Sequence, residues 1–159
     1  MSDRIAIRDA EPADAADIRR LVHANAAFHG KPELALVTDE MIRRDGFGPQ
    51  RLFFALLGFV DGRAVGIAQC TFRYNAWSGT RDLYVMNLFI DEPARKLGLG
   101  RALMIAAAKR SLDLGCAGLS LAVERTNLAL DFYKRLGMEV TDKMVACRFK
   151  SEELSALIG

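Results

Sequence analysis

An Asp61-Gly62 pair separates two β-rich runs near the middle of the chain. The runs cover residues 52–60 and 64–74. Asp-Gly between such runs is the strongest short signal for a two-residue β-hairpin, because both central positions of that turn need a positive φ. The sequence therefore predicts two adjacent antiparallel strands here.

Apolar periodicity on either side of the hairpin predicts further strands and helices. Ile5 and Ile7 alternate with polar residues as in a short strand, and a helix should follow Pro12. Thr38 is placed to cap a second, short helix. Beyond the hairpin we expect a strand at 83–90, a helix at 98–114, a strand at 119–123, a helix at 128–136, a strand at 138–149 and a terminal helix at 151–159. This order predicts an α/β (α+β) fold with a mixed sheet.

Length and charge narrow the class of protein. A chain of 159 residues fits one domain, so residues 1–159 are expected to form a single domain. With 22 basic and 20 acidic residues, the balance does not favour nucleic acid or an anionic membrane as a partner. No apolar run reaches the roughly 18 residues of a membrane span, and no signal peptide is recognisable. We expect a soluble, cytoplasmic protein.

The three cysteines, Cys70, Cys116 and Cys147, are widely spaced and form no CxxC pair. An odd number of dispersed cysteines is typical of buried thiols in a reducing compartment. Neither a disulfide nor a metal is expected.

Gly98 and Gly100 stand where the strand at 83–90 gives way to a helix. The first amides of a helix have no intrahelical acceptor and carry the positive end of the helix dipole, which suits a phosphate. Glycine lets that phosphate approach the backbone, and Arg95, Lys96 and Arg101 would add positive charge at the rim. The stretch lacks both the P-loop pattern and the third glycine of a dinucleotide fingerprint. Tight helix–strand packing is the alternative explanation of the two glycines.

The same stretch resembles the signature of the GNAT (Gcn5-related N-acetyltransferase) superfamily, [RQ]xxGx[GA], which Arg95, Gly98 and Gly100 match. A second block, NLALDFYKRLGMEV, is similar to the later motif of that family. Its matching residues are Asn127, Ala129, Phe132, Tyr133 and Gly137. The resemblance extends over nearly the whole chain.

The resemblance implies the GNAT fold: a mixed, mostly antiparallel sheet of about seven strands with about four helices, splayed between the strands at 83–90 and 119–123. It implies acetyl-CoA as co-substrate, with no metal. By similarity, the backbone of Leu88, Phe89 and Ile90 would bind the pantetheine arm. The pyrophosphate would lie on Arg95, Lys96, Leu97, Gly98, Leu99, Gly100 and Arg101, with Asn127 and Tyr133 as further coenzyme contacts. Tyr133 is the family's position for the general acid that protonates the leaving thiolate.

Within the superfamily, RRDGFGP, FRYNAWSGTRDLYVMNLFI and LAVERTNLALDFYKRLG look like the diamine (spermidine/spermine) and thialysine acetyltransferases, in which homodimers are usual. At three places where that subfamily usually carries a carboxylate, this chain has other residues: Met86-Asn87, Phe28-His29 and Asn75. A smaller amine or an amino acid is therefore favoured over an extended polyamine. The expected substrate-binding residues are Phe28, His29, Trp77, Met86 and Asn87.

The predicted function is acetyl-CoA-dependent N-acetylation of a primary amine on a small molecule. A non-catalytic acyl-CoA-binding module and an acetyltransferase acting on a protein amine are the alternatives. The general base is left open between His29, Glu124 and a water chain. Trp77 could equally wall the amine pocket or lie at a subunit interface. The chain has three basic doublets: Arg19-Arg20, Arg43-Arg44 and Lys109-Arg110. Of these, Arg43 or Arg44 would be the residue to receive a substrate carboxylate.

Overall fold

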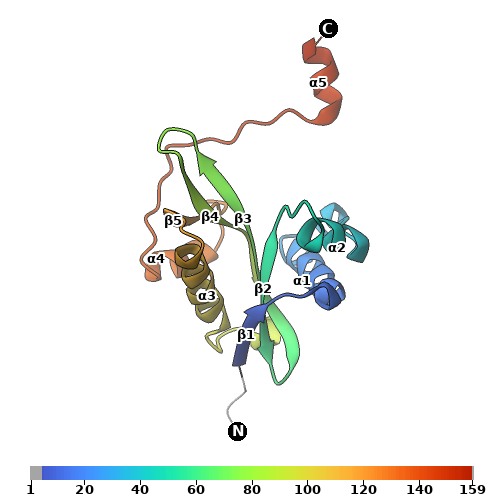
Figure 1. Ribbon diagram of the computed structural model, residues 1–159, viewed down its shortest axis with the longest axis vertical. Helices are drawn as coiled ribbons and strands as arrows, with labels where there is room; N and C mark the ends of the chain where they lie inside the picture. Colours follow the sequence, from blue (N-terminus) through green and yellow to red (C-terminus); the bar gives the residue numbers. More distant parts are fainter. Residues whose placement is uncertain (1–4, 159) are drawn as a thin grey trace. The chain divides into compact units, whose positions relative to one another are not determined.

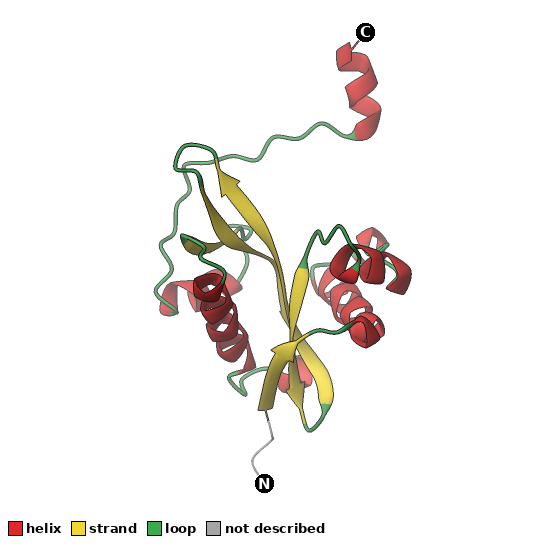
Figure 2. Cartoon of the chain, in the orientation of Figure 1, coloured by secondary structure: helices red, strands yellow, loops and turns green. Residues whose placement is uncertain are grey.

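A five-stranded sheet organises the first of two units in the computed structural model, which describes residues 5–158 (Figure 1). Its strands, in spatial order, are β1 (Ile5–Asp9), β2 (Phe54–Val60), β3 (Arg63–Asn75), β4 (Thr80–Ile90) and β5 (Gly118–Leu121). The first four pair antiparallel, and β4 pairs parallel with β5. The mixed, mostly antiparallel sheet predicted from the sequence is confirmed (Figure 2).

The central hairpin has the predicted turn. Asp61 and Gly62 have φ values of 49° and 81°, and Val60 pairs directly with Arg63. Two successive positive φ values are those of a two-residue turn whose twist matches the twist of the strands. The turn therefore fixes the register of β2 on β3 up to the register shift between Gly58 and Phe59.

Helices cover both faces of this sheet. Helices α1 (Ala15–Phe28) and α2 (Asp39–Phe47) lie on one face and α3 (Leu99–Asp113) on the other (Figure 1). Thr38 caps α2 as predicted, because its Oγ1 accepts a hydrogen bond from the amide of Met41 at 3.2 Å.

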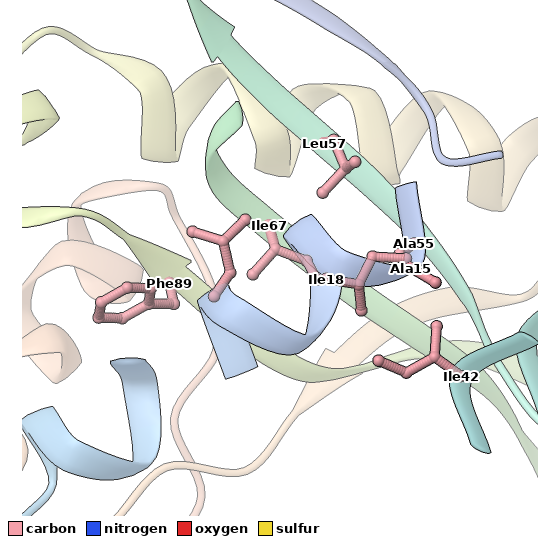
Figure 3. Packing of buried hydrophobic residues seen from close by; sticks show 8 residues of the cluster. Ala15, Ile18, Ile42, Ala55, Leu57, Ile67 and Phe89 are labelled. Atoms are coloured by element: carbon pink, nitrogen blue, oxygen red, sulfur yellow. The ribbon is translucent and has the colours of Figure 1, made fainter. Parts of the chain in front are cut away.

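The core between α1, α2 and the sheet contains Ile18, Ile42, Leu57, Ile67 and Phe89 (Figure 3). Ile18, Leu57 and Ile67 are completely buried. Burying each such aliphatic side chain contributes about 1.5–3 kcal/mol. This packing positions the end of α1 against the end of β4.

The second unit begins at Val123 and contains α4 (Ala129–Arg135) and α5 (Ser151–Ile158), both at predicted helices. The predicted strand at 138–149 is wrong: this segment belongs to no strand ladder, and residues 139–149 are exposed. The described part of the chain thus has five strands instead of about seven. A β-prone sequence becomes a strand only where a neighbouring edge accepts its hydrogen bonds, and local pattern does not reveal such an edge.

Candidate active site

The sheet is split between β4 and β5. The two strands pair only from Asp82 to Val85, although β4 continues to Ile90. Among the described residues, no strand pairs with this edge of β4 beyond Val85. The predicted splay is confirmed, and it leaves strand backbone available to a ligand.

Backbone groups of β4 alternate between its two edges. The amide of Asp91 donates to the carbonyl of Val65 on the β3 side, at 2.8 Å. In a regular strand the groups of Phe89 then face β3 as well, and those of Leu88 and Ile90 face the open edge. Two of the three residues expected to bind the pantetheine arm thus present polar groups to the split.

The turn after β4 presents a row of unpaired amides. Within residues 5–158, no protein acceptor is found for the amides from Lys96 to Arg101. The first helical bond of α3 is donated by Ala102 to Gly98, at 3.0 Å. Lys96 and Gly98 both have positive φ, 69° and 82°. Successive amides in such a turn form a concave anion site, and the dipole of α3 strengthens it.

Arg95 does not lie at the rim of this turn as the sequence suggested. Its guanidinium carbon is 4.3 Å from the centre of the Phe28 ring and 5.7 Å from that of Phe89. Its Nε donates to the carbonyl of Ile90 at 3.1 Å. Lys96 and Arg101 are exposed, which leaves these two cations beside the unpaired amides.

The end of α1 meets β4 on the opposite face of the sheet from α3. Phe28 is 59 % exposed, with its ring 5.4 Å from that of His29 and 6.3 Å from that of Phe89. Nδ2 of Asn25 donates a short hydrogen bond to Oδ1 of Asn87. The structure therefore gathers Phe28, His29 and Asn87, which the sequence had nominated, and adds Asn25.

Asn25 was missed by sequence reasoning. One signal was available, because Asn25 precedes Phe28 by three residues and hence shares its face of the helix. The hydrogen bond from Asn25 fixes Asn87 through its carbonyl oxygen, which leaves the NH2 group of Asn87 as a donor.

Met86 and Trp77 occupy different parts of the β3–β4 hairpin. Met86 is the extra residue of a β-bulge, at a register shift opposite Gln69 and Cys70, and is 44 % exposed. Trp77 is fully exposed at the hairpin tip, beyond Thr80, which is itself about 23 Å along β4 from Asn87. The structure does not bring Trp77 together with the other nominated residues.

Asn127 and Tyr133 belong to the second unit and are described within it. Oδ1 of Asn127 accepts from the amide of Ala129 at 2.8 Å, which supports the start of α4. Tyr133 is buried in α4, with its ring 5.2 Å from that of Phe132. Burial raises the pKa of Tyr133. No described residue hydrogen-bonds to its hydroxyl, so the phenol stays protonated at neutral pH with its proton available.

The basic doublets are mostly engaged in ion pairs. Arg19 pairs with Asp39 at 2.6 Å, Arg20 with Asp91 at 2.8 Å, and Arg44 with Asp45 at 2.7 Å. Arg44 thus has its own carboxylate partner.

The three thiols are unpaired, but the expectation of buried thiols is confirmed only for Cys70: Cys116 is half-buried and Cys147 is exposed. Burial raises the pKa of the Cys70 thiol to about 12. In the part of the chain that the structure describes, His, Cys, Asp and Glu form no group of three suited to a metal ion. None of the helices described is long and apolar enough to cross a membrane.

Comparison with known proteins identifies relatives over most of the chain. A family model described as the acetyltransferase (GNAT) family matches residues 18–138. A thialysine N-epsilon-acetyltransferase from Bos taurus is 28 % identical over 167 residues, covering 98 % of each chain. A spermidine/spermine N(1)-acetyltransferase-like protein 1 from Homo sapiens is 27 % identical over 163 residues, which cover 96 % of this chain and 23 % of the relative. These relatives confirm the resemblance to the diamine and thialysine branch.

The fold is similarly shared. The structure of an integron cassette protein from the mobile metagenome of V. cholerae superposes with a TM-score of 0.80, covering 99 % of this chain and 98 % of the other at 21 % identity.

Proposed function

Because this chain belongs to the acetyltransferase (GNAT) family, we propose that it transfers the acetyl group of acetyl-CoA to a primary amine of a small amine or amino acid. One observation carries the proposal: unpaired amides at the start of α3 lie next to a β4 edge that no described strand covers. The amides fit a diphosphate, and the strand edge fits the amide groups of pantetheine.

The coenzyme contacts follow from this arrangement. The diphosphate would bind the backbone from Lys96 to Arg101, including the amides of Leu97, Gly98, Leu99 and Gly100, with the Lys96 and Arg101 side chains as counter-charges. The backbone of Leu88 and the amide of Ile90 would hydrogen-bond the pantetheine arm, since the carbonyl of Ile90 accepts from Arg95, and Phe89 would support the strand from the core. The thioester would supply the acetyl group. A C–N bond to the amine nitrogen forms, the C–S bond breaks, and coenzyme A departs as its thiolate.

Two proton transfers must accompany this exchange. An alkylamine with a pKa near 10.4 is deprotonated in roughly one molecule per few thousand at pH 7, so a base or water must accept its proton. The departing thiolate takes a proton from an acid, which we propose is the hydroxyl of Tyr133. A protonated phenol without a hydrogen-bond partner among the described residues supports that role.

The acceptor site would lie at the end of α1. Phe28, His29 and Asn87 surround this position, with Arg95 behind the Phe28 ring. The hydrogen-bonded pair of Asn25 and Asn87 is uncharged. These two amides give a second ammonium group no ionic partner, which supports a small amine or an amino acid over an extended polyamine.

We propose a homodimer as the working form, with residues 1–159 acting as one catalytic domain. The exposed side chains of Val140, Met144, Val145 and Phe149 support an interface in this segment. Fully exposed Trp77 supports a second contact at the hairpin tip. The unpaired thiols favour a reducing compartment, the cytoplasm.

Release of free thiol from acetyl-CoA tests the activity across thialysine, other amino acids, diamines, spermidine and a lysine-containing peptide. Turnover should be greatest on an amino acid or small amine. Turnover only on the peptide would indicate that the acceptor is a protein amine. Tight coenzyme binding without turnover on any amine would favour the non-catalytic module, for which the named acetyltransferase relatives give no support.

A further inference from the structure

A cavity of about 350 Å³ lies in the first unit, at the end of α3 remote from the unpaired amides. Arg110 and Leu114 line it, whereas the unpaired amides, from Lys96 to Arg101, lie at the other end of the 15-residue helix, which is about 22 Å long. The remaining walls come from the end of β1, from residues 51–55, which lead into β2, and from residues 71–72 of β3. This cavity is separate from the proposed acetyl-transfer site.

Aromatic rings form much of the cavity wall. Phe53, Phe54 and Phe72 line it, and the rings of Phe54 and Phe72 are 6.2 Å apart in a tilted arrangement. Leu52 and Phe72 remain 63 % and 42 % exposed. An apolar ligand would thus contact aromatic rings and cover apolar side chains that are otherwise exposed to water.

The charged side chains that line the cavity leave one cation in excess, and the guanidinium carbon of Arg81 lies 4.1 Å from the centre of the neighbouring Phe72 ring. Arg110 donates to the carboxylate of Asp9, so these two charges compensate one another. Arg51 has no carboxylate partner in the described chain: its Nε donates to the carbonyl of Gly46 at 2.6 Å, and the rest of its guanidinium retains donors.

We propose that this cavity is a second ligand site, which binds a small aryl monocarboxylate. The guanidinium of Arg51 would bind the carboxylate, and the phenyl rings of Phe54 and Phe72 would contact the aryl group. The aromatic rings favour an aryl carboxylate over inorganic phosphate, which has no apolar group to contact them. The volume is at the lower end of the range for small-molecule pockets, which restricts the ligand to a compact molecule.

Calorimetric titration of the full chain with phenylacetate tests the proposal. Phenylacetate should bind saturably, one molecule per chain. The uncharged phenylacetamide should bind at least about tenfold more weakly, because it loses a charge-assisted hydrogen bond. Inorganic phosphate should not compete. Equal affinity for the amide, tighter binding of phosphate, or no saturable binding of phenylacetate would each overturn the proposal.

Two variants locate the site, and one serves as control. Arg51→Met should weaken phenylacetate binding at least tenfold, and so should Phe72→Ala, whose side chain is partly exposed and less critical to folding. Arg63→Met removes the same charge at the other end of β3, about 26 Å from Thr71, and should bind normally. Unchanged binding in both Arg51→Met and Phe72→Ala would contradict the assignment, whatever their stability.

Discussion

The guanidinium of Arg95 lies 4.3 Å from the centre of the Phe28 ring, and its Nε donates to the carbonyl of Ile90. One side chain therefore joins the end of α1, where the amine is proposed to bind, to the strand proposed to hold the pantetheine arm. Because Arg95 contacts both places, we expect its substitution to weaken the binding of both substrates.

Arg95→Lys tests the coupling. Lysine keeps the charge but loses the planar stack on Phe28 and the Nε donor, an effect of about 1 kcal/mol for the cation–π contact alone. We expect the KM values for both acetyl-CoA and the amine to rise about fivefold in steady-state kinetics. Lys96→Met, which changes an exposed neighbour, should raise only the KM for acetyl-CoA. An Arg95→Lys enzyme with an unchanged amine KM would show that Arg95 does not link the sites.

Gly98→Ala tests the anion-binding turn, and Gly62→Ala is its matched control. The two glycines have φ values of 82° and 81°, and a Cβ at either would have no neighbour within 4 Å. Each substitution should cost a similar 1–2 kcal/mol, roughly, in the free energy of unfolding, because each forces an L-residue into the left-handed region. Only Gly98→Ala should also weaken coenzyme A binding, by at least about tenfold in calorimetry. Equal coenzyme affinity in the two variants would contradict the assignment of the turn.

Tyr133→Phe tests the general acid. Loss of the hydroxyl should lower kcat by about 100-fold and leave coenzyme affinity nearly unchanged, since a positioned acid contributes about that much. Because burial raises the pKa of Tyr133 above that of a free phenol, the protonated, active form should persist to a more alkaline pH than a solvent-exposed tyrosine would allow. Tyr84→Phe removes a hydroxyl outside the proposed site and should be active. A fully active Tyr133→Phe enzyme would exclude the phenol as the acid.

Met86→Glu tests the proposed preference for small amines. Met86 is partly exposed at the β-bulge, so a carboxylate can be introduced there without being buried. The negative charge should lower the KM for diamines several-fold, by roughly 1 kcal/mol of partly screened attraction. Met86→Gln has the same length without the charge and should show no such gain. Equal gains from Gln and Glu would mean that shape, not charge, limits diamine binding.

Local signals predicted much of this fold, and contacts between distant segments account for what they missed. The Asp61-Gly62 turn and the Thr38 cap depend on residues close in sequence, and both were predicted. The strand at 138–149 was predicted from its local pattern, but a strand needs a partner edge that local pattern does not specify.

The same distinction applies to the candidate site. The glycine turn was visible as a motif because its amides are contiguous in sequence. The contact of Arg95 with Phe28 and the hydrogen bond of Asn25 with Asn87 join α1 to segments far along the chain. Such pairs depend on how α1 packs on β4, which local sequence does not specify. The sequence therefore predicted Arg95 at the rim of the turn, and not against Phe28.

A crystal structure of the protein with coenzyme A bound tests the central claim, that the unpaired amides at the start of α3 bind the diphosphate. The diphosphate oxygens should lie 2.7–3.2 Å from backbone nitrogens between Lys96 and Arg101, the normal range for such hydrogen bonds. A nucleotide bound elsewhere, with these amides turned to solvent or to the protein's own carbonyls, would contradict the proposed function.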